Sequence, residues 1–307
     1  MVLRHLVQRD NNVNDSHTGL DEKLMESNPI LEAFGNSVTS RNHNSSRFGK
    51  FLKLHFAGGK SSRKKVSLEL VIAGASVQTY LLERSRVTFH VRGERNYHVF
   101  YQLIHGADSG LREYLSLEDV DFEYLTPQEQ SSDTKVSKKE RKAAKVDKIS
   151  KKNMPSEEED ATNFQELLKS LAVIGLGHQP ESNELDLEDD ITASDDGKDI
   201  FGILASILHL GNLDFEDQDR PGGTAAVPVD DGPLHTAARL LQIDADDLLR
   251  SFTEVTVNTV GESITKQRNA SAARFAVDAV AKTLYVGLFQ YLVQRINSSL
   301  NNSDNIQ

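Results

Sequence analysis

The stretch that decides the fold reads NHNSSRFGK and covers residues 42–50. It gathers small hydroxyl groups, carboxamides and a cation directly before a segment that has the pattern of a strand. Hydroxyl oxygens suit a hard cation such as Mg²⁺, amide groups donate to phosphate oxygens, and an arginine holds a carboxylate through two hydrogen bonds. The stretch therefore has the chemistry of a phosphate and magnesium site. On composition alone, a solvated polar turn is the more common origin of such a run.

The residues that follow predict two antiparallel strands. From residue 50 to 56 apolar side chains alternate with polar ones, and the alternation returns over residues 67–73 after a turn rich in glycine and serine. A period of two is typical of a strand with one buried face. We expect Lys50–Phe56 and Ser67–Ala73 to pair in a sheet that has an unprotected edge.

Helical periods dominate the rest of the sequence, which predicts an α/β fold that is mostly helical. Tyr97, Phe100, Tyr101 and Ile104 have the i, i+3, i+4, i+7 spacing of one helix face, and Gly106 ends it. Further helices are predicted over residues 21–35, from a capping box at Thr162 to Gly175, over residues 200–210 and 234–241, and from Phe275 onward for roughly 25 residues. The polar runs 36–47, 181–199 and 221–233 are expected to be loops or connectors.

Composition excludes several classes of function. The 307 residues carry a net charge of −11 and contain no cysteine, which excludes disulfides, thiolate catalysis and cysteine-based zinc sites. The negative charge argues against a general nucleic-acid-binding protein. We expect no transmembrane helix, because there is no run of about 18 apolar residues, and no signal peptide, because the first residues lack an extended apolar segment and a small-residue cleavage site.

Residues 126–160 interrupt this organisation. Between Lys135 and Lys152 there are nine lysines and arginines against two acidic residues, a net charge of +7, and an acidic run follows. Such a segment lacks the apolar surface needed to offset the entropy of ordering. We predict a disordered insertion at 126–160 within one unit that covers residues 1–307.

Six stretches together closely resemble the myosin motor domain, with residues 42–50 in the place of its switch I region. The others read NPILEAFGN (28–36), YLLERSRV (80–87), ERNYHVFYQL (94–103), ILHLGNL (207–213) and DAVAK (278–282). Two features depart from the family pattern. One is the 126–160 insertion, and the other is Val277, where myosins usually carry arginine.

The resemblance implies a fragment of a P-loop NTPase-type myosin motor head, with a few strands and many helices. A Gly-x-x-x-x-Gly-Lys-Ser/Thr motif does not occur, because the nearest candidate, Gly59-Lys60-Ser61, has Leu54 where the first glycine must stand. We therefore expect the chain to begin just after a P-loop, to end before switch II and to be inactive in isolation. The implied function is a part of an actin-based, ATP-dependent motor. The alternative is a non-hydrolysing module that binds actin or another protein.

The same resemblance implies roles for individual residues and Mg-ATP as the cofactor. Asn42 and Asn44 would contact the nucleotide, and Ser45 would contact it and position the attacking water. Ser46 would ligate Mg²⁺ and contact the nucleotide, and Arg47 would act in catalysis by pairing with a glutamate of switch II, which the sequence lacks.

Residues 257–268 resemble the actin-contacting loop of the motor, and they imply Glu262, Lys266 and Arg268 as actin-binding residues. An acid at position 262 would supply constitutively a charge that phosphorylation supplies elsewhere. The implied partners are the actin filament, the rest of a myosin heavy chain and light chains, with no nucleic acid, in a cytoplasmic myosin complex on the actin cytoskeleton. A surface hairpin with an incidental glutamate is the alternative.

Overall fold

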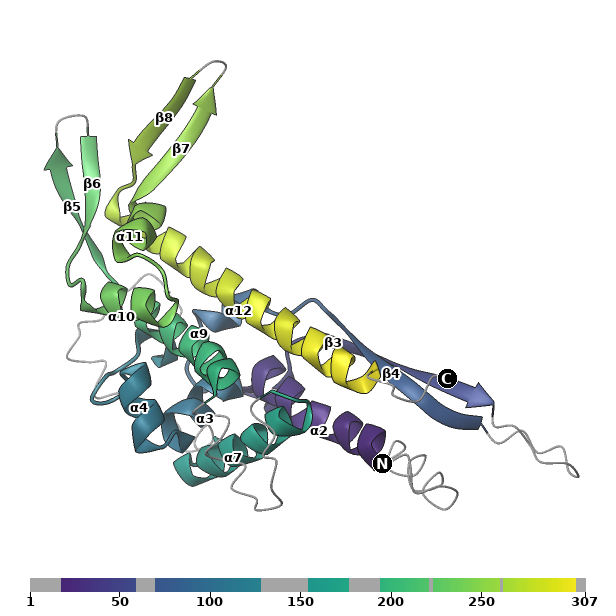
Figure 1. Ribbon diagram of the computed structural model, residues 1–307. Coiled ribbons are helices and arrows are strands. Elements are labelled where there is room, and N and C mark those ends of the chain that lie inside the picture. The colour runs from purple at the N-terminus through teal and green to yellow at the C-terminus, as the bar shows by residue number, and fades with distance from the viewer. Residues whose placement is uncertain are drawn as a thin grey trace, which may run out of the picture.

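The computed structural model describes residues 18–58, 70–127, 154–176, 194–220, 223–259 and 262–301. A single helix of 32 residues, α12 (Ala270–Asn301), runs along the helical body, and most of the other helices lie on one side of it (Figure 1). The core faces of α2 (Thr18–Gly35), α3 (His98–Gly106), α7 (Glu157–Val173) and α9 (Asp195–Gly211) meet beside the C-terminal half of α12. The fold therefore has a helical body organised around one central helix.

A second, smaller core lies at the N-terminal end of α12. It forms where α10 (Gly232–Leu240) and α11 (Ala245–Thr253) pack on α12. Val277 is fully buried in this cluster, beside Phe252 and Leu234. An apolar residue at position 277 therefore fits its surroundings, although the family pattern has arginine there. Three short helices complete the body: α4 (Ser109–Leu115), η1 (Arg84–Val87) and η2 (Glu123–Leu125).

The described strands form four separate antiparallel hairpins. They pair β1 (Asn36–Thr39) with β2 (Asn42–Ser46), β3 (Gly49–Gly58) with β4 (Leu70–Tyr80), β5 (Phe215–Arg220) with β6 (Gly223–Pro228), and β7 (Glu254–Thr259) with β8 (Glu262–Gln267). The β5–β6 and β7–β8 hairpins project together beyond the N-terminal end of α12 (Figure 1).

The expected antiparallel pair forms between β3 and β4, but its register differs from our prediction. Residues 50–54 lie opposite residues 75–79, because β4 continues to Tyr80. Only residues 70–73 of the predicted second strand 67–73 lie within the described part of the chain. One edge of the pair is partly protected, unlike our expectation. The Asn297 side chain, on α12, accepts a hydrogen bond from Val77 N at 2.7 Å and donates one to Val77 O at 2.8 Å. An amide side chain thus takes the place of a neighbouring strand at this point of β4.

Two predicted loops contain strands. The polar run 36–47 forms the β1–β2 hairpin, and the predicted connector 221–233 includes β6 and the start of α10. Neither segment has the apolar alternation that signals a strand. Their pairing comes from the backbone hydrogen bonds of the hairpins, which form without an apolar side-chain pattern.

The structure corrects the end of the predicted insertion. Residues 157–160 form the first turn of α7, which is capped by Ser156, whose hydroxyl accepts from Glu159 N at 3.1 Å. Thr162, predicted as the cap, lies inside the helix and donates to Glu158 O. Similarly, α9 begins at Asp195 with Ser194 as its cap, so residues 195–199 are helical rather than loop. Residues 128–153 of the insertion lie outside the described part of the chain.

The central helix α12 is also long and apolar enough to cross a membrane, by length and composition only, with a mean hydropathy of 1.2 over its most apolar window. This finding differs from the expectation drawn from the sequence. About two-fifths of that window (39%) is buried within the protein, and the buried face supplies core residues such as Tyr285, Leu288 and Leu292. A core helix meets the same criteria.

Candidate functional site

Residues 42–46 form the second strand of the β1–β2 hairpin, which follows α2 and precedes β3 in the chain. Its register pairs Asn36 with Ser46 and Ser37 with Ser45, and an irregularity follows before Thr39. The chain enters the hairpin directly from the last turn of α2 and leaves it at Arg47, whose amide donates to Gly35 O at 2.8 Å. The two ends of the hairpin are therefore tied to each other at the end of a helix.

The turn of the hairpin is held by short polar side chains. The Thr39 hydroxyl donates to Asn42 O at 3.1 Å and accepts from Asn42 N at 3.2 Å. The carboxamide oxygen of Asn42 accepts from Asn44 N at 3.0 Å. Asn42 is exposed, and its NH₂ group has no acceptor among the residues that the structure describes. That group is therefore available to donate to an anion.

The side chain of Asn44 serves the fold. Its NH₂ group donates to Glu32 Oε2 at 3.0 Å, and its oxygen accepts from Asn36 Nδ2 at 2.8 Å. The same oxygen lies 3.2 Å from His98 Nε2. These contacts anchor the hairpin to α2 and α3, so a nucleotide contact by Asn44 would have to compete with three partners.

The two serines of the hairpin have different surroundings. Ser45 is half-buried, and its hydroxyl accepts from Arg47 Nη1 at 3.2 Å. Ser46 is exposed, and its hydroxyl donates to Phe48 O at 2.9 Å. Because the hydroxyl proton is used in that bond, the lone pairs of the Ser46 oxygen remain for other interactions. Such an oxygen can serve as a ligand to a hard cation.

Arg47 has an acidic partner within this chain, unlike our expectation. Its Nε donates to Glu83 Oε2 at 2.5 Å. Glu83 also accepts from Arg86 Nε at 3.0 Å, and Arg86 donates to Glu94 at 3.0 Å. Glu94 in turn accepts from Ser40 N in the hairpin turn at 3.3 Å. A row of alternating charges thus runs along the hairpin from its end to its turn.

This row favours the charged forms of Glu83 and Arg86. Burial opposes ionisation of Glu83, but the hydrogen bonds and charges of Arg86 and Arg47 outweigh it and hold the pKa of Glu83 below its ordinary value. Burial likewise works against the cation of Arg86, and Glu83 and Glu94 raise its pKa. The glutamate was not assigned a role from the sequence. Its signal was its place in the quoted stretch 80–87, between two apolar residues and two arginines.

Two hollows in the described part of the molecule are relevant here, and the first is lined in part by the hairpin. One, of about 240 Å³, is polar and is lined by His43, His98 and the carboxylates of Glu32, Glu159 and Glu166. Its carboxylates would repel a phosphate, so this hollow is not the phosphate side of the hairpin. Among the described residues, no group of three histidines or carboxylates is arranged to hold a metal.

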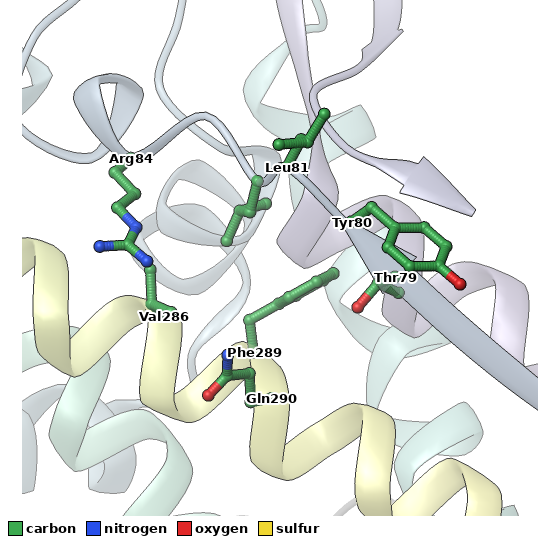
Figure 2. Close-up of a pocket in the computed structure, with 8 residues that line it drawn as sticks. Thr79, Tyr80, Leu81, Arg84, Val286, Phe289 and Gln290 are labelled. Carbon is green, nitrogen blue, oxygen red and sulfur yellow. The ribbon is translucent and has the colours of Figure 1, made fainter. Parts of the chain in front are cut away.

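The other hollow, of about 290 Å³, lies between the end of β4 and α12 (Figure 2). Leu81 stands at its mouth, 93% exposed and with a left-handed backbone (φ 57°). Phe289 forms its floor and packs edge-on against Phe48, with ring centroids 5.2 Å apart. Its walls are mainly apolar, and it adjoins Glu83 through Leu82 and Arg84. The sequence analysis did not find this feature.

The predicted actin-binding residues lie on β8 and just beyond it. Lys266 is exposed and stands opposite Val255 of β7. Arg268 is used by the fold, because its Nη1 donates to Ser251 O at 2.8 Å and to Phe252 O at 2.9 Å. It thereby caps the C-terminal end of α11. Glu262 begins β8 opposite Thr259.

The stretches 207–213 and 278–282, which lie far apart in the sequence, meet at a polar junction. Arg274 donates to Gly211 O at 2.9 Å and to Leu213 O at 2.6 Å, and it pairs with Asp278 at 3.3 Å. Asp278 also accepts from the hydroxyl of Tyr124 at 2.6 Å. These two stretches therefore act in packing, at a distance from the β1–β2 hairpin.

Three histidines of the helical body have partners within the protein. His98 contacts Asn44, His105 Nδ1 lies 3.1 Å from Asp160, and His209 Nε2 lies 2.9 Å from Leu115 O. Burial, followed by the charges of Arg95 and His43, lowers the pKa of His98 to about 4, so this histidine is neutral at pH 7.

The whole chain, residues 1–307, matches the family model described as myosin head (motor domain). It is 37% identical over 284 residues to unconventional myosin IC of Drosophila melanogaster and 35% identical over 276 residues to human unconventional myosin-XV. It is also 32% identical over 310 residues to myosin-2 of Lachancea kluyveri. These matches cover 92%, 90% and 99% of this chain, but only 22%, 6% and 17% of the relatives.

The chain belongs to the myosin head (motor domain) family. Its α/β fold, mostly helical with small sheets, is that of a part of a motor domain.

Proposed function

We propose that this chain works as part of an actin-based, ATP-dependent motor and supplies the switch I side of its Mg-ATP site. The observation that carries the proposal is the single hairpin that presents an exposed amide at Asn42, a hydroxyl oxygen at Ser46 and the cation of Arg47 beside Ser45. This donor set suits a magnesium phosphate, since it combines a hard oxygen ligand with donors to anionic oxygens.

In this proposal each side chain has a separate role. Asn42 donates to a phosphate oxygen, and Ser46 offers its oxygen to Mg²⁺. Ser45, held by Arg47, orients the attacking water. Asn44 acts indirectly by anchoring the hairpin to α2 and α3. When bound, Mg-ATP supplies the phosphoryl group and the metal that neutralises its charge.

Arg47 is the residue on which closure of the site would depend. Its bond to Glu83 holds the guanidinium beside Ser45. A glutamate of a switch II segment would have to share Arg47 with Glu83 or replace it. Arg47 therefore acts on hydrolysis more than on nucleotide affinity.

The exposed β7–β8 hairpin is proposed as an actin-contacting surface, with Lys266 and Glu262 as its contact residues. Arg268 supports this surface by capping α11. The proposed setting is a cytoplasmic myosin complex on the actin cytoskeleton, with the rest of a heavy chain and light chains as partners.

The nucleotide role is tested by titration and by phosphate release. The 307-residue chain is expected to bind Mg-ATP no better than roughly millimolar, since its sequence offers no P-loop lysine or phosphate-binding nest. An extended chain that adds a P-loop segment and a switch II segment should bind tightly and hydrolyse ATP. In it, Ser46→Ala should weaken the Mg²⁺-dependent step, and Arg47→Ala should lower hydrolysis more than affinity. Ser85→Ala, at an exposed serine outside the hairpin, is the matched control.

The alternative is a module that binds actin or another protein without hydrolysis. The bond between Arg47 and Glu83 favours it, because the arginine is already paired within the chain. Actin cosedimentation by the 307-residue chain, lost in Lys266→Glu but kept in Lys53→Glu on the β3–β4 hairpin, would support the surface common to both proposals. Failure of the extended chain to bind nucleotide would leave the binding module as the better proposal.

A further inference from the structure

Two buried tyrosines meet beneath the β1–β2 hairpin. Tyr97 is the residue before α3, and Tyr285 lies near the middle of α12. Both are fully buried, and their rings stack with centroids 4.7 Å apart and an interplanar angle of 14°. Burial raises the pKa of both hydroxyls well above the ordinary value, so each keeps its proton and acts as a donor.

Each hydroxyl donates to a main-chain carbonyl at one end of the hairpin. The Tyr285 hydroxyl donates to Phe34 O at 2.8 Å, and the Tyr97 hydroxyl donates to Glu83 O, also at 2.8 Å. Phe34 lies in the last turn of α2, where carbonyl groups have no partner within the helix. The next carbonyl, of Gly35, accepts from Arg47 N. The end of α2 is thus joined both to α12 and to Arg47, the residue that follows β2.

Glu83 completes the arrangement on the other side of Arg47. Its amide donates to Arg47 O at 3.0 Å, and its carboxylate accepts from Arg47 Nε. Arg47 is therefore held at its amide by Gly35, and at its carbonyl and guanidinium by Glu83. The two tyrosine hydroxyls bind Glu83 itself and the neighbour of Gly35.

We propose that the stacked pair Tyr97–Tyr285 positions Arg47 and the end of the hairpin, so that both tyrosines are positioning residues for the site. This inference rests on the proposed function of the hairpin. The stack gives the two hydroxyls a fixed separation, because two packed rings cannot shift independently. Helix α12 and the start of α3 thereby set the place of the Arg47 guanidinium through Phe34 and Glu83.

Hydrogen exchange of the Arg47 and Glu83 amides in the 307-residue chain tests the positioning. Tyr97→Phe and Tyr285→Phe keep the stack and each remove one hydroxyl. Loss of one net hydrogen bond should speed exchange at these amides roughly fivefold. The matched control is Tyr124→Phe, which removes a buried hydroxyl that donates to Asp278 and should leave the two amides unchanged.

Unchanged exchange in both variants, or an equal increase in Tyr124→Phe, would overturn the inference, because either result would reduce the pair to general packing. Should a phenylalanine variant not fold, Glu83→Gln tests the same geometry from a partly exposed position and should speed exchange at Arg47.

The extended chain separates this inference from the proposed function. There Tyr97→Phe and Tyr285→Phe should lower the rate of phosphate release severalfold while the affinity for Mg-ATP changes less than about twofold. If the extended chain binds Mg-ATP tightly but the tyrosine variants leave exchange at the Arg47 and Glu83 amides unchanged, only the positioning role is refuted. Altered exchange in a chain that binds no nucleotide would refute the proposed function, and with it the link of the pair to a nucleotide site.

Discussion

Replacing Asp160 by asparagine should destabilise the protein strongly, although this residue falls within the insertion predicted from the sequence. Asp160 is only 1% exposed. Its carboxylate accepts from Arg95 Nη1 at 2.9 and 3.2 Å, and it lies 3.1 Å from His105 Nδ1. Arg95 also donates to Pro155 O at 3.0 Å. These bonds join the first turn of α7 to the residues just before α3 and to the last turn of α3.

The magnitude follows from the loss of one partner of a buried ion pair. Asparagine keeps the shape of Asp160 but leaves the Arg95 cation, itself 13% exposed, without a counter-charge. Breaking such a pair reduces the free energy of unfolding by about 3 kcal/mol. At about 2 °C per kcal/mol for a chain of this size, the midpoint of thermal unfolding should fall by about 6 °C.

Thermal and urea denaturation followed by circular dichroism measure this effect. Glu158→Gln is the matched control, since Glu158 is an exposed acid in the same helical turn and its loss should change stability by less than about 0.5 kcal/mol. Replacing both Asp160 and Arg95 by apolar residues should recover part of the loss. A shift no larger than that of the control would refute the assignment of a structural ion pair to α7.

Three further predictions concern stability. Deleting Ser131–Lys152 should change the melting temperature by little, because its composition lacks core-forming residues, and a loss of several degrees would contradict that. Burial lowers the pKa of His90 and of His98 to about 4, against 6.5 in the unfolded chain. The charge of Arg86 adds to this effect at His90, and the charges of Arg95 and His43 add to it at His98. Acid therefore protonates the unfolded chain first, and between pH 7 and 5 each histidine should cost about 1–2 kcal/mol in urea titrations. His98→Gln should flatten that dependence. Gly35→Ala should cost about 2 kcal/mol in the same assay, because its Cβ would overlap the ring of Phe48, whereas Gly287→Ala, where the space is open, should cost nothing.

Local periodicity in the sequence was enough to predict several elements. The helix that ends at Gly106 and the antiparallel pair that starts near residue 50 follow from spacings within about ten residues. The boundaries were less predictable. The start of α7 depended on Ser156 as a cap, and the competing pattern at Thr162 satisfied the same rule of spacing. The hairpin strands of residues 36–46 had no apolar alternation to reveal them.

For the candidate site, the sequence by itself determined the inventory of chemical groups, while the tertiary structure decided how each is used. Residues 42–47 were identifiable as hydroxyl, amide and guanidinium donors from their types alone. Only the fold shows that Glu83 is the partner of Arg47, 36 positions away, and that Arg268 caps α11. The hydroxyl of Tyr285 reaches Phe34 across 251 positions. Side-chain patterns encode the contacts of one helix or strand, whereas these bonds depend on how separate elements pack, and packing is decided by the whole core at once.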